Sequence, residues 1–186
     1  MKIAVLCSGS GSNFENILRT VTKHEVVLMI HNTEKCGAVK RASKFGVPHI
    51  HISHKNEDLQ IMTLKAFHVD LIVLAGYMRI LSPKFVQSFD KIINVHPSLL
   101  PKYKGANAIE QALDSGDDTT GCTVHYVTDE LDSGDIILQS KVPIMPDDDI
   151  KSLTKAVQRR EYGILPDAIN LIGDSLESVP KVKTTV

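Results

Sequence analysis

Short runs of β-branched and aliphatic residues alternate with longer helical patterns through the first hundred residues of the chain. This alternation is typical of βαβ units, in which helices connect parallel strands and cover both faces of the sheet. The sequence therefore predicts an α/β fold built on a mostly parallel open sheet with helices on both faces. The expected strands are 2–7, 26–30, 49–52, 71–75 and 92–95, and the expected helices are 13–20, 38–45, 57–67 and 83–89.

The sequence changes character after about residue 118, where two extended segments follow one another without a helix between them. Residues 119–127 and 136–142 are predicted strands, and the stretch that joins them, 128–135, is rich in turn-forming residues. A connection of this kind favours neighbouring strands that run in opposite directions. We therefore expect an antiparallel edge toward the C-terminus.

A last helical region is predicted at 148–172. Pro166 lies inside it and should break or kink the helix, because proline lacks an N–H and crowds the preceding turn. The acids Asp147–Asp149 could suggest a metal site, but acids that open a helix more often complement its dipole. We therefore predict capping acids at the start of this region and a loosely ordered tail at 174–186.

Composition limits the kind of partner. The 21 lysines and arginines are balanced by 22 aspartates and glutamates, so the chain lacks the basic excess that nucleic-acid binding favours. With 5% aromatic residues and no tryptophan, stacking platforms for single-stranded nucleic acid would be sparse. No apolar stretch approaches the roughly 20 residues of a membrane span. We expect a single domain over residues 1–186, monomeric or oligomeric, that binds small molecules rather than nucleic acid or membranes.

The cysteines indicate a reducing compartment. Cys7, Cys36 and Cys122 are odd in number, widely spaced and free of any Cys-x-x-Cys pair, which argues against a disulfide framework or a zinc knuckle. The apolar run at the N-terminus is too short for a signal peptide. We therefore predict reduced thiols in a cytoplasmic protein.

A glycine-rich loop, Ser8-Gly-Ser-Gly-Ser-Asn13, separates the first predicted strand from the first predicted helix. Such a loop can direct unhindered backbone N–H groups and a helix N-terminus at an anion. Phe14 replaces the third glycine of the dinucleotide fingerprint and there is no Walker lysine, so a phosphate monoester is favoured over NAD or ATP. The alternative is a tight turn that binds nothing, because a lone glycine pattern is a weak signal.

Asn94 and His96 lie two positions apart in the fifth predicted strand, so they share one face at its carboxyl end. Ligands of open parallel sheets bind in the crevice at this edge. An asparagine N–H and a protonated histidine could together bracket an oxygen that becomes negative during acyl transfer. The alternative is a hydrogen-bonded pair that closes a turn. Ser98 lacks a Gly-x-Ser-x-Gly elbow, so a serine nucleophile has little support.

Asp132 lies in the turn-rich stretch, where aspartate is ordinarily a turn former. Close to His96, however, its carboxylate would hold one tautomer of the imidazole and accept a proton from an attacking amine through water. Spacing alone does not join the two residues, so both interpretations stand. For His125, and for the pair His49 and His51, we expect local packing or hydrogen bonding, since no third ligand is spaced to complete a metal site.

Four ordered blocks span nearly the whole chain and are far more specific together than any one alone. They are Ala4-Val-Leu-Cys-Ser-Gly-Ser-Gly-Ser-Asn13, Leu74-Ala-Gly-Tyr-Met-Arg-Ile-Leu-Ser-Pro83, Asn94-Val-His-Pro-Ser-Leu-Leu-Pro101 and Val124-His-Tyr-Val-Thr-Asp-Glu-Leu-Asp132. In these blocks the chain resembles the phosphoribosylglycinamide formyltransferases, folate-dependent enzymes of purine synthesis.

The resemblance implies a Rossmann-like formyltransferase fold and a specific reaction. The formyl group of 10-formyltetrahydrofolate, the cosubstrate, would pass to the amine of glycinamide ribonucleotide by direct attack through a tetrahedral intermediate, without a metal. Residues 1–100 would form the half that binds the ribonucleotide phosphate, and residues 101–173 the half that binds folate.

The resemblance also implies roles for single residues. Asn94, His96 and Asp132 match the catalytic asparagine, histidine and aspartate, and His125 matches a histidine near that centre. The positions that match the ribonucleotide site are Gly11, Ser12, Asn13, Gly76, Met78 and Glu161. The positions that match the folate pocket are Arg79, Ile80, Leu81, Val127, Thr128, Asp129 and Asp132.

The chain departs from the family pattern at three places. Ser133-Gly134-Asp135 stands where relatives often have Gly-Gly-Pro, which should alter the flexibility of the loop that carries Asp132. Tyr162 follows Glu161 where a histidine is common. Residues 53–68 look shortened, so the contact to the folate glutamate tail is left unassigned.

Other functions share the same polar cluster. Methionyl-tRNA formyltransferases resemble longer chains with a nucleic-acid-binding domain, and formyltetrahydrofolate hydrolases carry an additional N-terminal regulatory domain. We expect neither domain here. The third alternative is a non-catalytic sensor of phosphate ligands on the same fold, against which the intact set Asn94, His96 and Asp132 argues.

Overall fold

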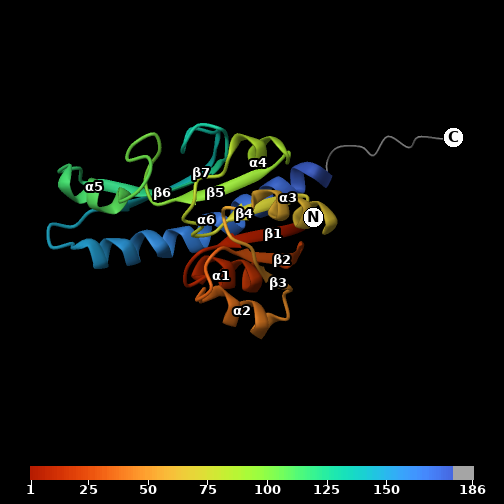
Figure 1. Ribbon diagram of the computed structural model, residues 1–186. Helices are drawn as coiled ribbons and strands as arrows, with labels where there is room; N and C mark the ends of the chain where they lie inside the picture. The colour runs from red at the N-terminus through yellow and green to blue at the C-terminus, as the bar shows by residue number, and fades with distance from the viewer. Residues whose placement is uncertain (178–186) are drawn as a thin grey trace.

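A seven-stranded sheet forms the centre of the computed structural model, which describes residues 1–177 (Figure 1). The strand order is β3-β2-β1-β4-β5-β6-β7. Strands β1 to β5 pair in parallel, whereas β6 pairs antiparallel with both β5 and β7. The predicted α/β class and its antiparallel C-terminal edge are confirmed. The strands are β1 (Lys2–Cys7), β2 (Glu25–His31), β3 (His49–His51), β4 (Leu71–Leu74), β5 (Ile92–His96), β6 (Thr119–Tyr126) and β7 (Ile136–Pro143).

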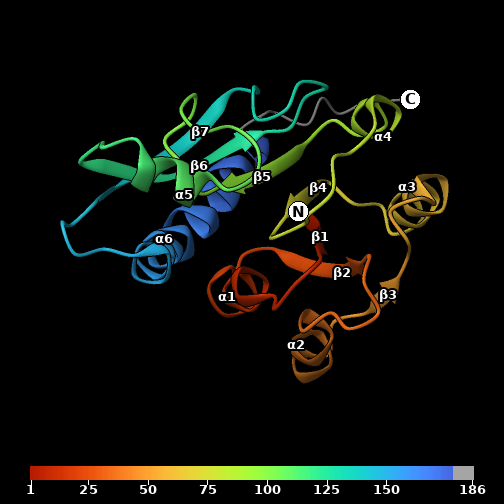
Figure 2. The same ribbon diagram turned by 60° about the vertical axis from the view of Figure 1, so that its left-hand side comes forward.

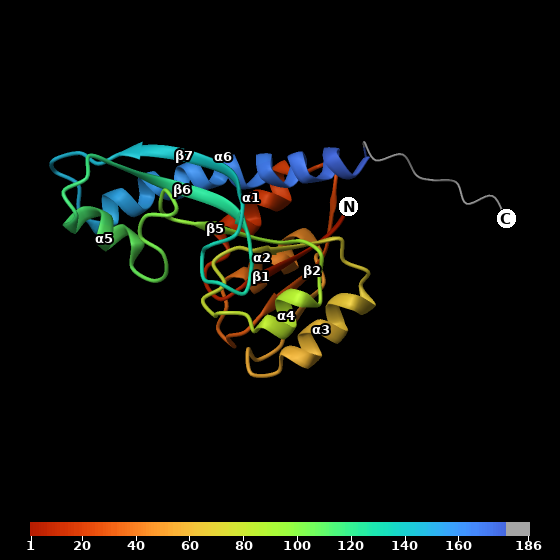
Figure 3. The same cartoon turned by 90° about the horizontal axis from the view of Figure 1, so that it is seen from above.

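Helices cover both faces of the sheet (Figure 2). In the described chain they are α1 (Ser12–Thr20), α2 (Ala38–Phe45), α3 (Glu57–Ala66), α4 (Pro83–Gln87), α5 (Ala108–Asp114) and α6 (Ile150–Glu177). Side chains of α1, α2 and α6 pack on one face, and side chains of α3 and α4 pack on the other. The long helix α6 runs beside β6 and β7 (Figure 3). None of the helices within residues 1–177 has both the length and the apolar character needed to cross a membrane.

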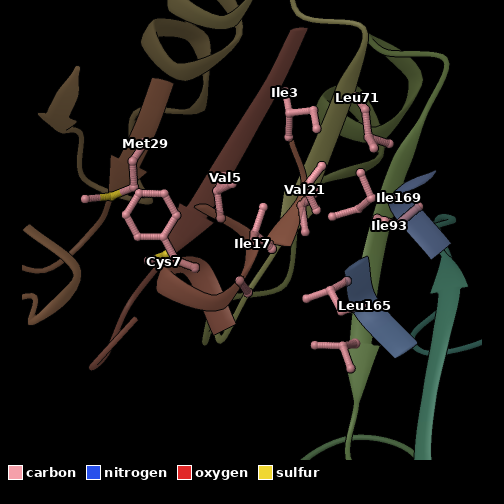
Figure 4. Packing of buried hydrophobic residues seen from close by; sticks show 14 of the residues in the cluster. Ile3, Val5, Cys7, Ile17, Val21, Met29, Leu71, Ile93, Leu165 and Ile169 are labelled. Atoms are coloured by element: carbon pink, nitrogen blue, oxygen red, sulfur yellow. The ribbon is translucent and has the colours of Figure 1, made fainter. Parts of the chain in front are cut away.

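Strand β1 connects the two layers of core because its successive side chains point to opposite faces. Ile3 and Val5 pack with Ile17 of α1 and with Leu165 and Ile169 of α6 (Figure 4). Ala4 and Leu6 belong to the cluster on the other face. Every residue of β1 after Lys2 is buried, which is the pattern of a central parallel strand covered on both sides.

Helix α6 continues through Pro166, so the predicted break does not occur. A proline at this position leaves the carbonyl of Tyr162, four residues earlier, without its helical donor. The side-chain Nδ2 of Asn16 in α1 donates to that carbonyl at 2.7 Å. Packing of α1 against α6 therefore supplies the missing donor. Residues 174–177, expected in the loose tail, belong to the helix, and the rest of that predicted tail lies outside the described residues.

Local capping follows the sequence prediction. Asp149 Oδ1 accepts from the backbone N–H of Ser152 at 2.7 Å, and the carboxylate of Asp148 accepts from Met145 N and from Ser152 Oγ. Asp149 therefore caps the start of α6 as predicted, whereas Asp148 binds a backbone N–H that precedes the helix and a side-chain hydroxyl. At other helix ends, Gly46 adopts the left-handed conformation after α2, and the hydroxyl of Ser82 accepts from the N–H of Phe85.

Helix α5 was not predicted. Asn107 precedes it but makes no side-chain capping bond, and the helix has only seven residues. Isolated helices this short are marginal in water, so their stability comes from tertiary packing. Ile109 packs in a separate cluster with Cys122 and Val142 of the antiparallel strands and with Leu153 of α6.

The sheet has a topological switch point between β1 and β4. From β1 the chain builds outward to β2 and β3, whereas from β4 it builds in the opposite direction to β5. In open α/β sheets the crevice at the carboxyl ends of such strands is where ligands bind. The glycine loop follows β1 at this edge, and the segment that contains Gly76 follows β4.

Candidate functional site

The pairing of β5 with β6 brings Asn94 and two histidines together at this edge of the sheet. Asn94 lies opposite His125 in the antiparallel register, and His96 lies two residues after Asn94 on the same face. Asn94 Nδ2 is 3.5 Å from His125 Nε2. His96 and His125 are 5% and 2% exposed, so their polar atoms depend on protein partners for hydrogen bonds.

Asp132 joins the two histidines. Its Oδ2 lies 3.4 Å from Nδ1 of His96, and its Oδ1 lies 3.5 Å from Nε2 of His125. The backbone of Asp132 has a φ of 47°, in the left-handed region that aspartate tolerates better than most residues. The structure therefore gives Asp132 both features that the sequence left open, a turn conformation and a position beside His96.

The Asp132 carboxyl is held in its charged form. Burial opposes ionisation, but hydrogen bonds from His125 and from the backbone N–H of Gly105, at 2.8 Å, outweigh it together with the charges of the two histidines. The net result is a pKa below the ordinary value of 3.8. A carboxylate that is ionised between two imidazoles can balance a positive charge on either ring.

The second ring nitrogen of His96 also has a partner. Nε2 lies 2.7 Å from the backbone carbonyl of Tyr103, to which it donates when it carries the proton. The protonated ring thus has an acceptor at each N–H, Asp132 at Nδ1 and Tyr103 at Nε2. This differs from the expectation that His96 presents a free N–H to an oxyanion. In this geometry both ring nitrogens of His96 face protein acceptors.

The side chain of Ser8 connects the loops at the switch point. The N–H of Ser8 donates to the carbonyl of Gly76 at 3.0 Å, and its hydroxyl donates to Oδ1 of Asn32 at 2.7 Å. The same hydroxyl accepts from the N–H of Met78 at 2.9 Å. The segments that follow β1, β2 and β4 are therefore fixed relative to one another beside the polar cluster.

Gly11 precedes α1 in a conformation that requires glycine. Its φ is 74°, and a Cβ built there would lie 2.6 Å from the Cβ of Ala38 in α2. As the N-cap residue it has no side chain to bond the first-turn N–H groups, which begin with Ser12 and Asn13. Those groups and the helix dipole could receive an anion, and phosphate binding by this loop stays a prediction.

Asn13 and Glu161 meet although they belong to α1 and α6. Asn13 Nδ2 donates to Glu161 Oε2 at 2.8 Å, and the side-chain oxygen of Asn13 is buried without a hydrogen-bond partner in the structure. Burial raises the pKa of Glu161 above 4.5, while the bond from Asn13 acts in the opposite direction. The neutral carboxyl is therefore favoured more than in water, next to the glycine loop.

The two segments predicted for the folate pocket, 78–81 and 127–129, contain both exposed and buried residues. Met78 and Ile80 are 75% and 78% exposed, an unusual state for large apolar side chains, whereas Leu81 is buried. Val127 is half-buried and its N–H donates to the carbonyl of Ile92 at 2.9 Å. The remaining residues predicted for the folate pocket, Arg79, Thr128 and Asp129, are exposed.

Helix α3 lies in the 53–68 region that looks shortened in sequence, and its side chains contact the 77–82 segment. Gln60 of α3 is fully buried and donates to the hydroxyl of Tyr77 at 3.3 Å. Glu57, in the first turn of the same helix, accepts from the N–H of Ser82 at 3.0 Å and from its hydroxyl. Helix α3 therefore fixes both ends of the 77–82 segment.

The other histidines and the cysteines have local roles. The rings of His31 and His51 stack with centroids 5.2 Å apart, and His49 Nδ1 lies 3.3 Å from the carbonyl of Val47. Within residues 1–177, no group of three histidine, cysteine, aspartate or glutamate side chains could hold a metal ion. The three cysteines are buried free thiols.

Sequence reasoning did not single out Tyr103 and Gly105, which hold His96 and Asp132 through backbone atoms. Backbone contacts leave little trace in residue type. The available signals were Gly105 itself, which has a φ of 77°, and its place in the loop that directly follows the Asn94 block.

The model of the family described as formyl transferase matches residues 1–169 of the chain. The chain belongs to the formyl transferase family. It is 42% identical to the phosphoribosylglycinamide formyltransferase of Haemophilus influenzae over 177 residues, which covers 89% of this chain and 84% of the relative. The predicted family resemblance is thereby confirmed.

Two further relatives show how the length of this chain compares with that of known proteins. The trifunctional purine biosynthetic protein adenosine-3 of Drosophila melanogaster is 41% identical over 92% of the chain, which spans only 14% of that protein. The crystal structure of phosphoribosylglycinamide formyltransferase from Anaplasma phagocytophilum has a TM-score of 0.91 and 37% identity, covering 94% of this chain and 87% of its own. The chain thus corresponds to most of a phosphoribosylglycinamide formyltransferase and to a small part of the trifunctional proteins.

Proposed function

We propose that this formyl transferase moves the formyl group of 10-formyltetrahydrofolate to the amine of glycinamide ribonucleotide. The observation that carries the proposal is the Asp132 carboxylate, held between His96 and His125, with Asn94 beside His125. Such a cluster suits acyl transfer, in which charge develops on a carbonyl oxygen. The names of the relatives support the choice of substrates.

The glycine loop suits the ribonucleotide. Gly11, Ser12 and Asn13 would receive its phosphate at the N-terminus of α1, where N–H groups and the helix dipole favour an anion. Glu161 and the segment from Gly76 to Met78 would face the glycinamide end. Burial disfavours the charge of Glu161, which weakens the tendency of this carboxyl to hold the amine as an unreactive ammonium ion.

The exposed apolar segment suits the folate. Met78 and Ile80 leave apolar surface beside the cluster, which the pterin and its aromatic neighbour would cover. Backbone groups of Arg79 to Leu81 and of the 127–132 loop would bind the pterin edge. In this arrangement the formyl group reaches Asn94 and His96 from the side opposite the glycine loop, so both substrates meet in one crevice.

The chemistry follows from the positions of the charges. The neutral amine attacks the formyl carbon, a new C–N bond forms, and negative charge moves to the formyl oxygen. Asn94 Nδ2 donates a hydrogen bond to that oxygen, and the imidazolium of His96, balanced by Asp132, stabilises it by charge. Asp132 receives the amine proton through water and returns it toward N10 as the C–N10 bond breaks.

The test is an assay with glycinamide ribonucleotide and 10-formyltetrahydrofolate, with a control that omits the ribonucleotide. We expect tetrahydrofolate and formylated ribonucleotide to appear in equal amounts, and only when both substrates are present. Folate release without the amine would indicate a hydrolase instead. Tight binding of both ligands without turnover would indicate a non-catalytic sensor.

A further inference from the structure

The carbonyl that faces His96 belongs to a residue with an unusual backbone. Tyr103 has a φ of 55°, in the left-handed region that bulky side chains rarely adopt. Such a conformation costs free energy and persists only where the surroundings hold it. Tyr103 is held at both ends. Its carbonyl lies 2.7 Å from His96 Nε2, and its hydroxyl donates to Oδ2 of Asp117 at 2.6 Å.

Asp117 is a charged anchor for this tyrosine. Lys102 Nζ also donates to its Oδ2, at 2.6 Å, and the hydrogen bonds from Lys102 and then Tyr103 lower the pKa of Asp117. An ionised acceptor makes shorter and stronger hydrogen bonds than a neutral one. Asp117 lies just before β6 begins at Thr119, and β6 carries His125. The anchor therefore ties the Tyr103 loop to the strand that contains part of the polar cluster.

The same loop also holds Asp132. The N–H of Gly105, two residues after Tyr103, donates to Asp132 Oδ2 at 2.8 Å. Between them, Lys104 Nζ donates to Ser133 Oγ at 2.6 Å, although both of those side chains are exposed. Tyr103 and Gly105 thus each bind one member of the His96–Asp132 pair. Any displacement of Tyr103 changes the position of both.

We propose that Asp117 and the hydroxyl of Tyr103 are positioning residues for the His96–Asp132 pair. Neither group lies next to the reacting atoms, and each acts through the backbone of the Tyr103 loop. Without the hydroxyl bond, Tyr103 leaves the left-handed conformation, His96 Nε2 loses its acceptor and the bond from Gly105 to Asp132 loosens. The kinetic part of this inference rests on the proposed formyl transfer, and the geometric part does not.

The test compares Tyr103→Phe and Asp117→Ala with the control Lys102→Met, which removes the exposed partner of Asp117 but leaves the tyrosine bond. Nitrogen-15 NMR of the His96 ring in the ligand-free protein reports the proton on Nε2. We expect this proton to exchange at least about tenfold faster with solvent in the first two variants, because its acceptor has moved. Lys102→Met should match the wild type, since exposed ion pairs contribute little.

Kinetics give a second measure. In both variants kcat should fall roughly 10-fold to 100-fold while KM for either substrate changes less than about twofold, because the catalytic pair is misplaced and the binding loops are not. The double variant should be no slower than the slower single variant, since both substitutions break one connection.

The possible results separate this inference from the proposed function. Unchanged His96 proton exchange in both Tyr103→Phe and Asp117→Ala would overturn the positioning role, whatever the activity. A wild-type protein without formyl transfer would overturn the proposed function, while the NMR comparison would still decide the role of Asp117. If Tyr103→Phe does not fold, as judged by circular dichroism, Asp117→Ala, which keeps the tyrosine side chain, decides alone.

Discussion

Replacement of Gly11 by alanine tests the link between the glycine loop and the rest of the fold. Two separate costs are expected. The left-handed backbone at Gly11 disfavours any side chain, and the new Cβ would lie 2.6 Å from the Cβ of Ala38. Because Ala38 is fully buried at the start of α2, the helix has to move to relieve the overlap.

Two other glycines separate these costs. Gly46 has the same kind of backbone, with a φ of 68°, but open space around its Cβ position. Gly46→Ala should therefore show the conformational cost alone, about 1–2 kcal/mol. Gly11→Ala adds an overpacking cost of about 1–3 kcal/mol, for a total of about 2–5 kcal/mol. Gly9 has neither problem, so Gly9→Ala should be neutral or slightly stabilising.

Thermal unfolding measures all three variants. For a domain of this size each kcal/mol corresponds to roughly 2–4 °C, so Tm should fall by about 4–20 °C in Gly11→Ala and about 2–8 °C in Gly46→Ala. Where Gly11→Ala still folds, KM for the ribonucleotide should rise and KM for the folate should not. Equal values of Tm in Gly11→Ala and Gly46→Ala would refute the reasoning, because the contact with Ala38 would then cost nothing.

Three further predictions concern the polar cluster and its surroundings. Asn94→Ala and Asp132→Asn should fold but lose on the order of 10² to 10³ in turnover, with the exposed Asp135→Asn in the same loop as control; near wild-type turnover would contradict the assigned role. Because burial raises the pKa of Glu161 above 4.5, the stability that this group contributes is present below pH 4.5 and is lost as the pH rises through its higher folded value. The side chain in Glu161→Gln cannot ionise, so this variant should not lose that stability. Its Tm should exceed the wild-type Tm by a margin that grows as the pH rises from 4.5. A margin that does not change with pH would contradict this prediction. Gly134→Ala should lower stability by about 1–3 kcal/mol in urea unfolding, because its Cβ would overlap the carbonyl of Tyr126, and an unchanged midpoint would show that the loop can move aside.

Much of the fold could be predicted because its signals are local. Alternation of strands and helices, the glycine after α2 and the Ser82-Pro83 start of α4 all depend on neighbouring residues. The predictions failed where contacts between residues far apart in the sequence determine the structure. Helix α5 is stabilised by packing against α6 and the antiparallel strands. The continuity of α6 at Pro166 depends on a donor from Asn16, far away in the sequence.

The candidate site divides in the same way. Asn94 and His96 could be predicted as a pair because strand periodicity places them on one face. The contact of His96 with Asp132 could not be derived from spacing, because it depends on the path of the loop between β6 and β7, which brings Asp132 back to the last residue of β5. The backbone contacts from Tyr103 and Gly105 were missed since residue type scarcely encodes them.

The sequence by itself determined the α/β class, the glycine loop and the kinds of polar group available, because these follow from periodicity and chemistry over a few residues. Only the tertiary structure decided which groups meet. The ionised Asp132 between two histidines, the burial of Glu161 and the Asp117 anchor all arise from contacts between separate elements. Hydrogen bonding and burial set the charge of a side chain, and both are properties of the folded chain rather than of its local sequence.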